Sequence, residues 1–470
     1  MIQVLMLLNQ LIVVYYVFAL CAYGFLIIAA LWSNRRHRKF LKASVLETLM
    51  DSSYTPPVSI LVPAYNEAVT ISETVRSLLK LRYPEIEVVV INDGSSDDTL
   101  ETLSRNFDLV PFRWVYPPQP PCAPIRNVYV SLSEPRLMVI DKENGGKSDA
   151  LNAGLNVARS PYFCTIDADA LLEPDALLRV MAPVLDSRST VMASGGIVRV
   201  ANGCRIDGGV VREVHLPRRP VEVLQVLEYL RGFLFGREGW SAINALLIIS
   251  GAFGVFSRKV ALQVNGYRRD SVAEDMDLVV RMHRHLLERG EPYQVVFVPD
   301  PVCWTEVPWS FHLLARQRRR WQKGLLDVLW RNRRMMFNPR YGRVGLLAFP
   351  YQVAVELLGP LIEVVGIASI IASAMLGLFG QSSLLYLLIF AYLAGTCISV
   401  AAVLLEELNY KRYGTLRELL RLFAYAFFDF FPYRQFLVAC RIWGMVEHFQ
   451  RPHKWGEQRR RGFASAEVVK

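Results

Sequence analysis

The chain has 470 residues, of which 52% are hydrophobic, and it carries a formal net charge of +10. This length allows one large domain with additional segments. The seven cysteines show no CxxC spacing, which argues against a structural zinc site or a disulfide framework and suits a reducing cytosol. Long uncharged apolar stretches favour a lipid bilayer, and not nucleic acid, as the partner of the excess positive charge.

The first apolar stretch covers residues 4–32, which is long enough to cross the hydrocarbon core of a bilayer with some tilt. The basic sequence NRRHRK follows at residues 34–39. Basic flanks prefer the cytoplasmic side of a membrane. We therefore expect a transmembrane helix in residues 1–33 with its N-terminus outside, followed by a basic cytoplasmic linker in residues 34–55.

The middle of the chain has the pattern of an α/β domain, expected at residues 56–310. Apolar runs typical of buried strands lie at residues 58–67, 86–99, 136–141 and 162–170, with helical patterns between most of them. Such alternation predicts a mostly parallel, Rossmann-like sheet with helices on both faces. A proline-rich insertion at residues 106–135 separates the second and third runs, and the sequence defines no role for it.

Ligands of parallel sheets bind beyond the carboxyl ends of the strands. Three predicted strands end in acidic or amide residues, namely Asn66, Glu67, Asn92, Asp93, Asp167 and Asp169. Asp167 and Asp169 lie two residues apart, and close carboxylates favour a cation such as Mg²⁺ or Mn²⁺ between them, with an exposed turn as the alternative. The GGKS sequence at residues 145–148 lacks the earlier glycine of a P-loop, but Lys147 can still approach phosphate oxygens.

Another predicted helix begins with Glu274 and Asp275, where an acid either serves chemistry or only complements the helix dipole. His283 and His285 lie two residues apart on different faces of this helix. We expect both histidine side chains at the surface.

The sequence QRRRW at residues 317–321 places Gln317, Arg320 and Trp321 on one helix face. This face presents an amide, a guanidinium suited to phosphate and an indole suited to stacking. The side chains of Arg318 and Arg319 point elsewhere, and we expect them to meet lipid headgroups or acidic partners.

An interfacial segment at residues 311–343 leads into transmembrane and interfacial helices at residues 344–449. Residues 353–379 and 384–405 have the length of membrane spans, which makes three crossings with the first helix. Residues 416–449 contain Asp429, Pro432 and Arg434, so this segment either lies in the interface or crosses twice.

Five motifs occur in order, namely PAYNE at 63–67, NDGSSDDT at 92–99, DAD at 167–169, AED at 273–275 and QRRRW at 317–321. Over roughly residues 56–324 they resemble the motif set of family 2 glycosyltransferases. The QxxRW motif resembles the processive, membrane-embedded branch, with cellulose, chitin, hyaluronan and poly-N-acetylglucosamine synthases. The resemblance implies a GT-A fold and an inverting enzyme that uses a UDP-sugar to extend a β-linked exopolysaccharide and passes it across the membrane.

The resemblance also implies roles for individual residues. Asp275 would be the general base, and Asp169 with Asp167 would hold Mg²⁺ or Mn²⁺. The donor would be bound by Tyr65, Glu67, Asp93, Lys147 and Asp167. The acceptor sugar and the pyrophosphate would be bound by Ser250, Gly251, Glu274, Gln317, Arg320 and Trp321. Glu356 and Glu363, seven residues apart on one helix face, would either line a polymer path or be buried against a partner helix.

The basic tail at residues 450–470 partly resembles the WGTR element that closes over the nucleotide in hyaluronan-type synthases. Trp455 matches this element, and Arg459 stands near the position of its missing arginine. A basic tail without a gating role is the alternative. A gating role would place the C-terminus in the cytoplasm.

We therefore expect a multi-pass protein of the inner (plasma) membrane with a cytoplasmic catalytic domain. Its partners would be a UDP-sugar, a growing polysaccharide and the lipid bilayer. Two other functions compete, a non-processive transferase that adds one sugar to a lipid carrier and an inactive nucleotide-sensing receptor. The sequence leaves open the sugar, the linkage and the need for a small membrane partner subunit or a homo-oligomer.

Overall fold

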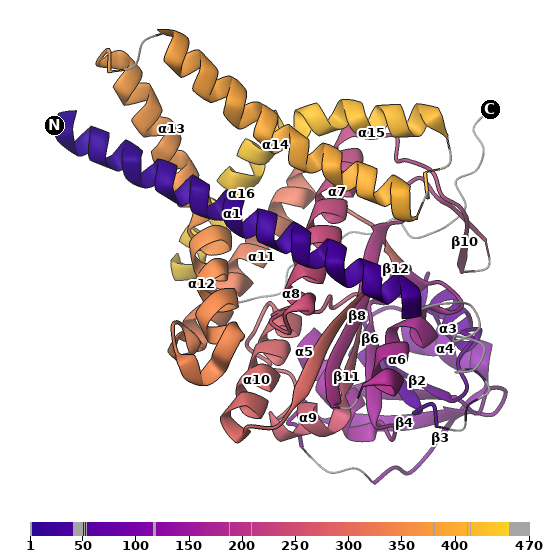
Figure 1. Cartoon of the computed structure of the whole chain (residues 1–470). Coiled ribbons are helices and arrows are strands. Elements are labelled where there is room, and N and C mark those ends of the chain that lie inside the picture. Colours follow the sequence, from indigo (N-terminus) through magenta and orange to yellow (C-terminus); the bar gives the residue numbers. More distant parts are fainter. Residues whose placement is uncertain are drawn as a thin grey trace. The chain divides into compact units, whose positions relative to one another are not determined.

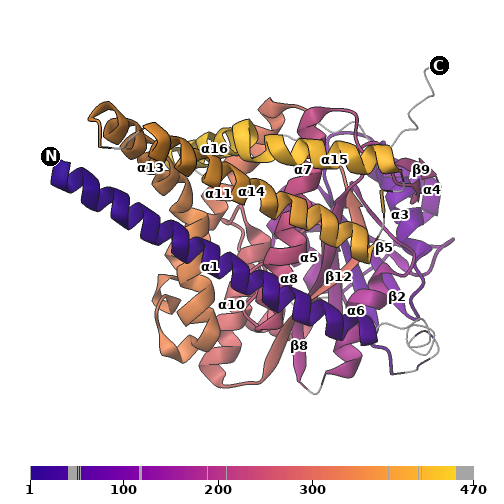
Figure 2. The ribbon, with the colours of Figure 1, turned by 45° about the horizontal axis from the view of Figure 1, so that its top comes forward.

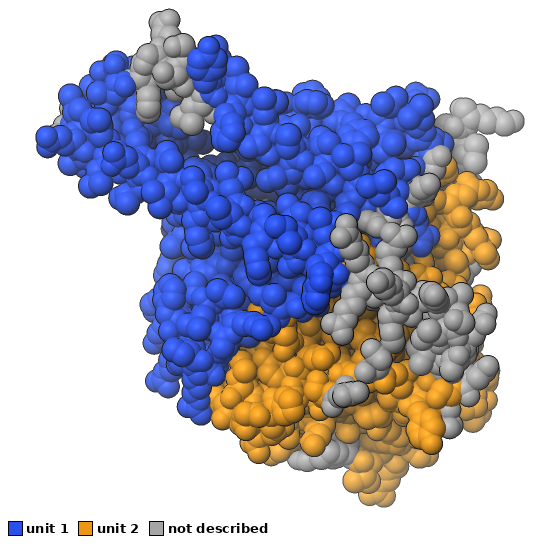
Figure 3. Space-filling model, viewed as in Figure 1, with its two compact units in different colours: residues 1–33, 217–243, 308–452 blue, residues 34–216, 244–307, 453–470 orange. Residues whose placement is uncertain are grey.

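The computed structural model divides the chain into two compact units, which are described separately and coloured in Figure 3. The sheet unit comprises residues 34–216, 244–307 and 453–470, and the helical unit comprises residues 1–33, 217–243 and 308–452. The structure describes residues 2–40, 50, 52, 54–115, 119–187, 189–207, 209–378, 381–410, 412–413 and 415–450.

A ten-stranded mixed sheet forms the core of the sheet unit, in the order β3-β4-β5-β2-β1-β6-β11-β8-β12-β7 (Figure 1). Its strands are β1 (Val58–Ala64), β2 (Ile86–Asp93), β3 (Leu109–Pro111), β4 (Ile125–Ser131), β5 (Leu137–Lys142), β6 (Tyr162–Ile166), β7 (Ala170–Leu172), β8 (Thr190–Val200), β11 (Phe253–Ser257) and β12 (Tyr293–Thr305). The neighbours β5, β2, β1 and β6 run parallel, which confirms the α/β prediction. A separate hairpin pairs β9 (Arg205–Asp207) with β10 (Val210–Glu213).

Helices connect and cover these strands. They are α3 (Ile71–Leu79), α4 (Thr99–Phe107), α5 (Lys147–Val157), α6 (Ala176–Asp186), α9 (Arg258–Gln263) and α10 (Glu274–Arg289). Helix α5 is buried from Ser148 to Val157. It packs on β1 and β2, and a Cβ added at Gly154 would lie 3.1 Å from Ile91 Cδ1 and 3.2 Å from the Leu61 side chain. The small residue lets the helix approach the sheet closely enough to place its N-terminus beside the strand ends.

The proline-rich insertion is partly built into the sheet. It contributes β3 and β4, which extend the sheet antiparallel beside β5. Strand β11 is also antiparallel and lies between β6 and β8. The sequence did not predict these strands because β3 has only three residues, β4 carries the polar residues Arg126 and Asn127 near its start, and the five residues of β11 include a glycine.

The expected exposure of His283 is wrong, because this side chain is completely buried. One ring nitrogen lies 2.7 Å from the Tyr293 hydroxyl and the other lies 2.9 Å from the Leu246 carbonyl oxygen. Two polar partners on neighbouring segments make burial of the imidazole acceptable. The histidine therefore ties α10 to the start of β12 and to the loop before β11.

Replacing His283 with Gln should reduce the acid sensitivity of the fold. Burial lowers the pKa of His283 to about 4, against the opposing effect of the Leu246 carbonyl, whereas the unfolded chain has a histidine pKa of about 6.5. As the pH falls below 6.5, the unfolded chain therefore binds a proton at this histidine and the native state does not. The free energy of unfolding falls by about 2 kcal/mol between pH 7 and pH 5 as a result. Thermal unfolding of both proteins at these pH values measures the difference. An exposed-site control, His312→Gln, should behave like the wild type, and an unchanged pH dependence of His283→Gln would contradict the assignment.

The helical unit consists of helices of very different length. They are α1 (Ile2–Phe40, with residues 2–33 in this unit), α7 (Pro220–Arg231), α8 (Glu238–Ala242), α11 (Phe311–Arg331), α12 (Phe349–Tyr351), α13 (Gly359–Met375), α14 (Gln381–Asn409), α15 (Leu416–Phe428) and α16 (Arg434–Gln450). Short π-helical segments are η1 (Gly232–Arg237), η4 (Val344–Ala348), η5 (Gln352–Leu357) and η6 (Asp429–Tyr433), and 3₁₀ turns are η2 (Arg333–Met335) and η3 (Pro339–Tyr341).

Two helical segments of the described chain, Ile2–Asn34 and Ile389–Leu408, are long and apolar enough to cross a membrane. A third arises if Val344–Leu357 and Gly359–Met375, bent by 48°, count as one broken span. These lengths and compositions mark a membrane protein. The N-terminus and the turn between α13 and α14 lie at the same end of the helical unit in Figures 1 and 2. Asn9 on α1 bonds to the Ser373 and Ser369 hydroxyls of α13 at 2.8 and 2.7 Å, a polar helix contact typical of membranes.

Three acidic residues of the later helical segments have basic partners within this unit. Glu363 accepts from Arg434 at 2.9 Å, and Glu356 accepts from Arg441 at 3.0 Å, so both glutamates pair with α16. Asp429 forms an ion pair with Arg231. Glu363 is buried against its partner helix, because a charge in an apolar environment is stable when it is paired, whereas the Glu356 side chain is 34% exposed beside Arg441.

Candidate active site

The loops that follow β1 and β2 are tied together at the carboxyl edge of the sheet. Asn66 has a left-handed backbone (φ 55°), and its side-chain oxygen accepts the Ser96 N–H at 2.8 Å. The Glu67 N–H donates to the Thr99 hydroxyl at 2.9 Å. Tyr65 is half exposed beside these contacts. The two predicted donor-binding residues of this loop, Tyr65 and Glu67, are thus held at a strand end on a locally braced backbone.

Lys147 lies close to acidic groups from two segments that are far apart in the sequence. Its ammonium lies 2.6 Å from Asp167 Oδ1, just after β6, and 3.2 Å from Glu274 Oε1, at the start of α10. Burial acts to lower the pKa of Lys147, but Asp167, Glu274 and Asp275 outweigh it and raise the pKa above its usual value. The lysine therefore stays cationic and holds the acids close together.

Asp275 lies in the first turn of α10, next to this cluster. Its Oδ2 accepts the backbone N–H of Gly251 at 3.0 Å, and its Oδ1 accepts the N–H of Met276 at 2.8 Å. A Cβ added at Gly251 would lie 3.3 Å from Lys147 Nζ and 3.4 Å from Asp275 Oδ2. The glycine thus lets the loop before β11 approach both charged groups. Ser250, whose hydroxyl accepts the Ala252 N–H at 3.4 Å, precedes it.

Asp169 is buried in the turn between β6 and β7, two residues from Asp167. Carboxylate oxygens are the ligands that Mg²⁺ and Mn²⁺ prefer. Among the described residues, no group of three or more His, Cys, Asp or Glu is arranged to hold a metal ion. Metal binding by Asp167 and Asp169 stays a prediction, and such an ion would also need oxygens from a bound ligand and water.

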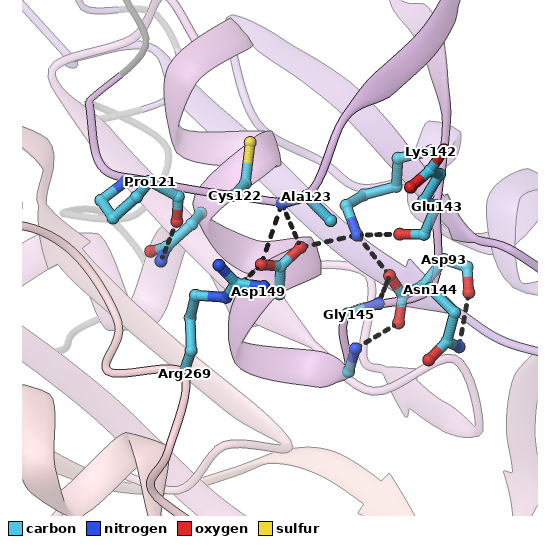
Figure 4. A network of polar contacts seen from close by, with 12 residues as sticks. Asp93, Pro121, Cys122, Ala123, Lys142, Glu143, Asn144, Gly145, Asp149 and Arg269 are labelled. Carbon is cyan, nitrogen blue, oxygen red and sulfur yellow. Dashed lines mark hydrogen bonds and ion pairs between the residues drawn. The ribbon is translucent and has the colours of Figure 1, made fainter.

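A second lysine cluster, unpredicted from the sequence, lies beneath the same edge (Figure 4). The completely buried ammonium of Lys142 lies 2.5 Å from Asp93 Oδ1 and 2.6 Å from Asp149 Oδ1. Asp93 also accepts the N–H groups of Gly145 at 3.0 Å and Gly146 at 2.7 Å. The carboxylate of Asp93 therefore fixes the turn that precedes Lys147, and its donor-binding role stays a prediction. The sequence feature that could have indicated this buried cluster is Lys142, a lysine at the end of an apolar strand.

The QRRRW motif lies on α11 in the helical unit. Gln317, Arg320 and Trp321 are half buried or exposed, whereas Arg318 is buried and lies 4.1 Å from the Trp321 ring centre. Arg318 donates to Gln317 Oε1 at 2.5 Å and to Glu228 Oε2 at 2.7 Å. Burial would raise the pKa of Glu228, but Arg318 and Tyr433 lower it overall. The acidic-partner alternative therefore holds for Arg318, whose long side chain reaches Glu228 on α7.

The neighbouring bases of this helix also pair within the unit. Arg319 and Lys323 lie 2.8 and 3.0 Å from the two carboxylate oxygens of Glu447 on α16. The acidic-partner alternative therefore holds for Arg319. The approach of Gln317, Arg320 and Trp321 to Asp275 remains a prediction, and Trp455 and Arg459 lie outside the described residues.

A GT-A-type sheet with acids at its strand ends, together with family comparisons, defines the chain as a glycosyltransferase. Residues 59–205 match the glycosyl transferase family 2. Residues 162–405, more than half of the chain, match the glycosyl transferase family group 2, and the chain belongs to this family. This identifies the enzyme class and confirms the resemblance stated from the motifs.

Curated relatives include the poly-β-1,6-N-acetyl-D-glucosamine synthases of Staphylococcus epidermidis and Staphylococcus aureus strain COL. The first is 29% identical over 279 residues, and the second is 28% identical over 275 residues. Each match covers 58% of this chain and 56% of the relative. The chain therefore spans about half the length of the curated relatives it matches.

Similar solved structures include the mannosyltransferase PcManGT from Pyrobaculum calidifontis in complex with GDP-Man and Mn²⁺. It is 20% identical and covers 86% of this chain and 99% of its own, with a TM-score of 0.49. Another is Staphylococcus aureus TarS 1–349 in complex with UDP-GlcNAc, which is 17% identical and covers 58% of this chain and 67% of its own, with a TM-score of 0.33.

Replacing Lys147 with Met should lower the turnover of the nucleotide-sugar roughly 100-fold or more, because one preorganised charge at the reaction centre is lost. The same change leaves Asp167, Glu274 and Asp275 facing one another without the cation between them. Nucleotide release by the purified protein measures the effect. Lys259→Met, at an exposed lysine, should retain full turnover, and a Lys147→Met protein within a few-fold of wild type would refute the role.

Proposed function

We propose that this protein is an inverting, processive glycosyltransferase that extends a β-linked exopolysaccharide from a UDP-sugar. The observation that carries the proposal is the position of Asp275, whose carboxylate accepts the Gly251 N–H beside the Lys147–Asp167–Glu274 cluster. A carboxylate held next to fixed cationic and backbone N–H groups suits a reaction in which a hydroxyl loses a proton while a phosphate leaves.

The donor would bind along the strand ends. Tyr65, Glu67 and Asp93 would face the nucleoside, and Lys147 would meet the phosphates as their negative charge grows. Mg²⁺ or Mn²⁺ held by Asp169 and Asp167 would neutralise part of the phosphate charge and so improve the leaving group. The UDP-GlcNAc in the TarS complex is consistent with this donor class, although the fold likeness itself adds no weight.

In the transfer step, Asp275 would accept the proton of the acceptor hydroxyl as that oxygen bonds to the anomeric carbon. The bond from the anomeric carbon to the phosphate oxygen breaks at the same time, and UDP leaves with the electron pair. One base without a covalent nucleophile implies a single displacement. An α-linked donor would therefore give a β-linked product.

Processive growth and export would involve the helical unit. Ser250, Gly251 and Glu274 would hold the acceptor sugar, and Gln317, Arg320 and Trp321 would position it with the pyrophosphate. With the expected spans, a cytoplasmic catalytic domain and an inner-membrane location, the product would pass outward through the bilayer. The relatives' names support N-acetylglucosamine as the sugar to test first.

The test is UDP release by the membrane-reconstituted protein across a panel of UDP-sugars with Mg²⁺ or Mn²⁺. One sugar should give rapid release, and Asp275→Asn should reduce it roughly 100-fold to 10,000-fold because the base is lost. Asp277→Asn is the matched control for charge on the same helix. Its carboxylate pairs with Arg281 at 2.6 Å and Arg268 at 3.2 Å, so it serves folding.

High-mass product together with Asp275-dependent release would support the processive proposal. Release with a single sugar added to lipid would replace it with the single-transfer function. UDP binding without release from any sugar in the panel would favour the nucleotide-sensing receptor.

A further inference from the structure

Four charged side chains form a continuous line from the donor side of the site to the segment before Asp275 (Figure 4). Arg269 Nε lies 2.6 Å from Asp149 Oδ2, and Asp149 Oδ1 lies 2.6 Å from Lys142 Nζ. Lys142 Nζ in turn lies 2.5 Å from Asp93 Oδ1. Lys142 and Asp149 are completely buried, whereas Arg269 is 49% exposed. Two cations balance two anions in this line.

The proline-rich insertion is hydrogen-bonded to one of these four side chains, Asp149. The Ala123 N–H donates to both oxygens of Asp149, at 2.9 and 3.0 Å. One turn further along α5, the Asn152 amide donates to the carbonyl oxygens of Pro121 at 3.1 Å and Tyr267 at 2.9 Å, and its oxygen accepts the Tyr267 N–H at 2.7 Å. Buried polar side chains on one face of α5 thus hold two chain segments that are far apart in sequence.

The turn at Gly266 shows how tightly these segments fit. Gly266 has φ 62°, and a Cβ there would lie 2.5 Å from both Pro120 Cγ and Asn152 Oδ1. Only a glycine combines this backbone conformation with such a close approach. The insertion therefore packs directly against the segment that leads through Arg269 to the first turn of α10.

We propose that Arg269 is a positioning residue that couples the segment before Asp275 to the Gly145–Gly146 turn before Lys147, through Asp149, Lys142 and Asp93. The proposal depends on the proposed function in one respect only. That function makes the segment before Asp275 the acceptor side of the site and the Gly145–Gly146 turn the donor side. With Arg269 present, Asp149 is shared between two cations. Without it, Lys142 must balance two buried carboxylates alone, so its ammonium is drawn toward Asp149 and its hold on Asp93 weakens. The backbone N–H groups bonded to Asp93 then lose their fixed acceptor.

The test compares Arg269→Gln with Arg268→Gln. Arg268 is the adjacent, 35% exposed arginine of the same segment, and it pairs with Asp277 at 3.2 Å instead of Asp149. Hydrogen–deuterium exchange is measured on the full-length, nucleotide-free protein. Arg269→Gln should speed exchange roughly fivefold to tenfold at Ala123 and also at Gly145 and Gly146, which Arg269 does not contact. Arg268→Gln should change exchange at these glycines by less than about twofold, and Arg269→Lys, which keeps the charge, should restore slow exchange.

Faster exchange confined to Ala123 and residues 267–271, with Gly145 and Gly146 unchanged, would overturn the proposal. Equal effects of the two arginine variants at the glycines would overturn it as well. The affinity for UDP, measured in parallel, should fall by a similar factor in Arg269→Gln. If exchange at the glycines responds as expected but wild type does not bind UDP, the coupling stands and the proposed donor class fails.

Discussion

The structure of the catalytic domain depends on how two lysines neutralise the acids that a parallel sheet collects at one edge. Parallel strands end together, so side chains that follow β1, β2, β5 and β6 are brought to a common place whatever their charge. Lys147, whose side chain is 16% exposed, balances Asp167 and Glu274, and Lys142 balances Asp93 and Asp149 in the interior. Buried carboxylates without such partners would repel one another and destabilise the fold. The same arrangement thus provides both stability and a concentrated polar site.

In the helical unit, acidic side chains in a more apolar environment are likewise paired with basic side chains. Several of its acids pair with arginines on other helices, as in Glu363 with Arg434 and Glu228 with Arg318. A guanidinium is suited to these positions because it is planar, always charged and able to bond two partners at once. Arg318 illustrates this, since it bonds Gln317 and Glu228 while its guanidinium lies against the Trp321 ring. Removal of Glu228 would leave the buried Arg318 without its ion-pair partner, which costs about 3–5 kcal/mol.

Much of the domain could be predicted from its sequence because strand-end motifs report a local pattern. The runs before Asn66, Asp93 and Asp167 are apolar enough to identify strands, and their polar ends identify the site edge. Contacts between side chains that are far apart in the sequence could not be predicted. The partners of Lys142 lie on β2 and α5, those of His283 lie in the loop before β11 and on β12, and β4 carries two adjacent polar residues, Arg126 and Asn127. In QRRRW, the helical spacing predicted which side chains share a face. It could not predict that Arg318 reaches an acid on another helix.

The central claim is that Asp275 drives a single displacement whose product stays bound for further additions. The most direct measurement is nuclear magnetic resonance of the anomeric protons, together with the mass of the product, after reaction of the reconstituted protein with its preferred α-linked UDP-sugar. Single displacement with continued growth predicts β-anomeric protons throughout a product of many sugars from the earliest times of the reaction. An α-linked product would contradict the single displacement, and a product that gains only one sugar would contradict continued growth.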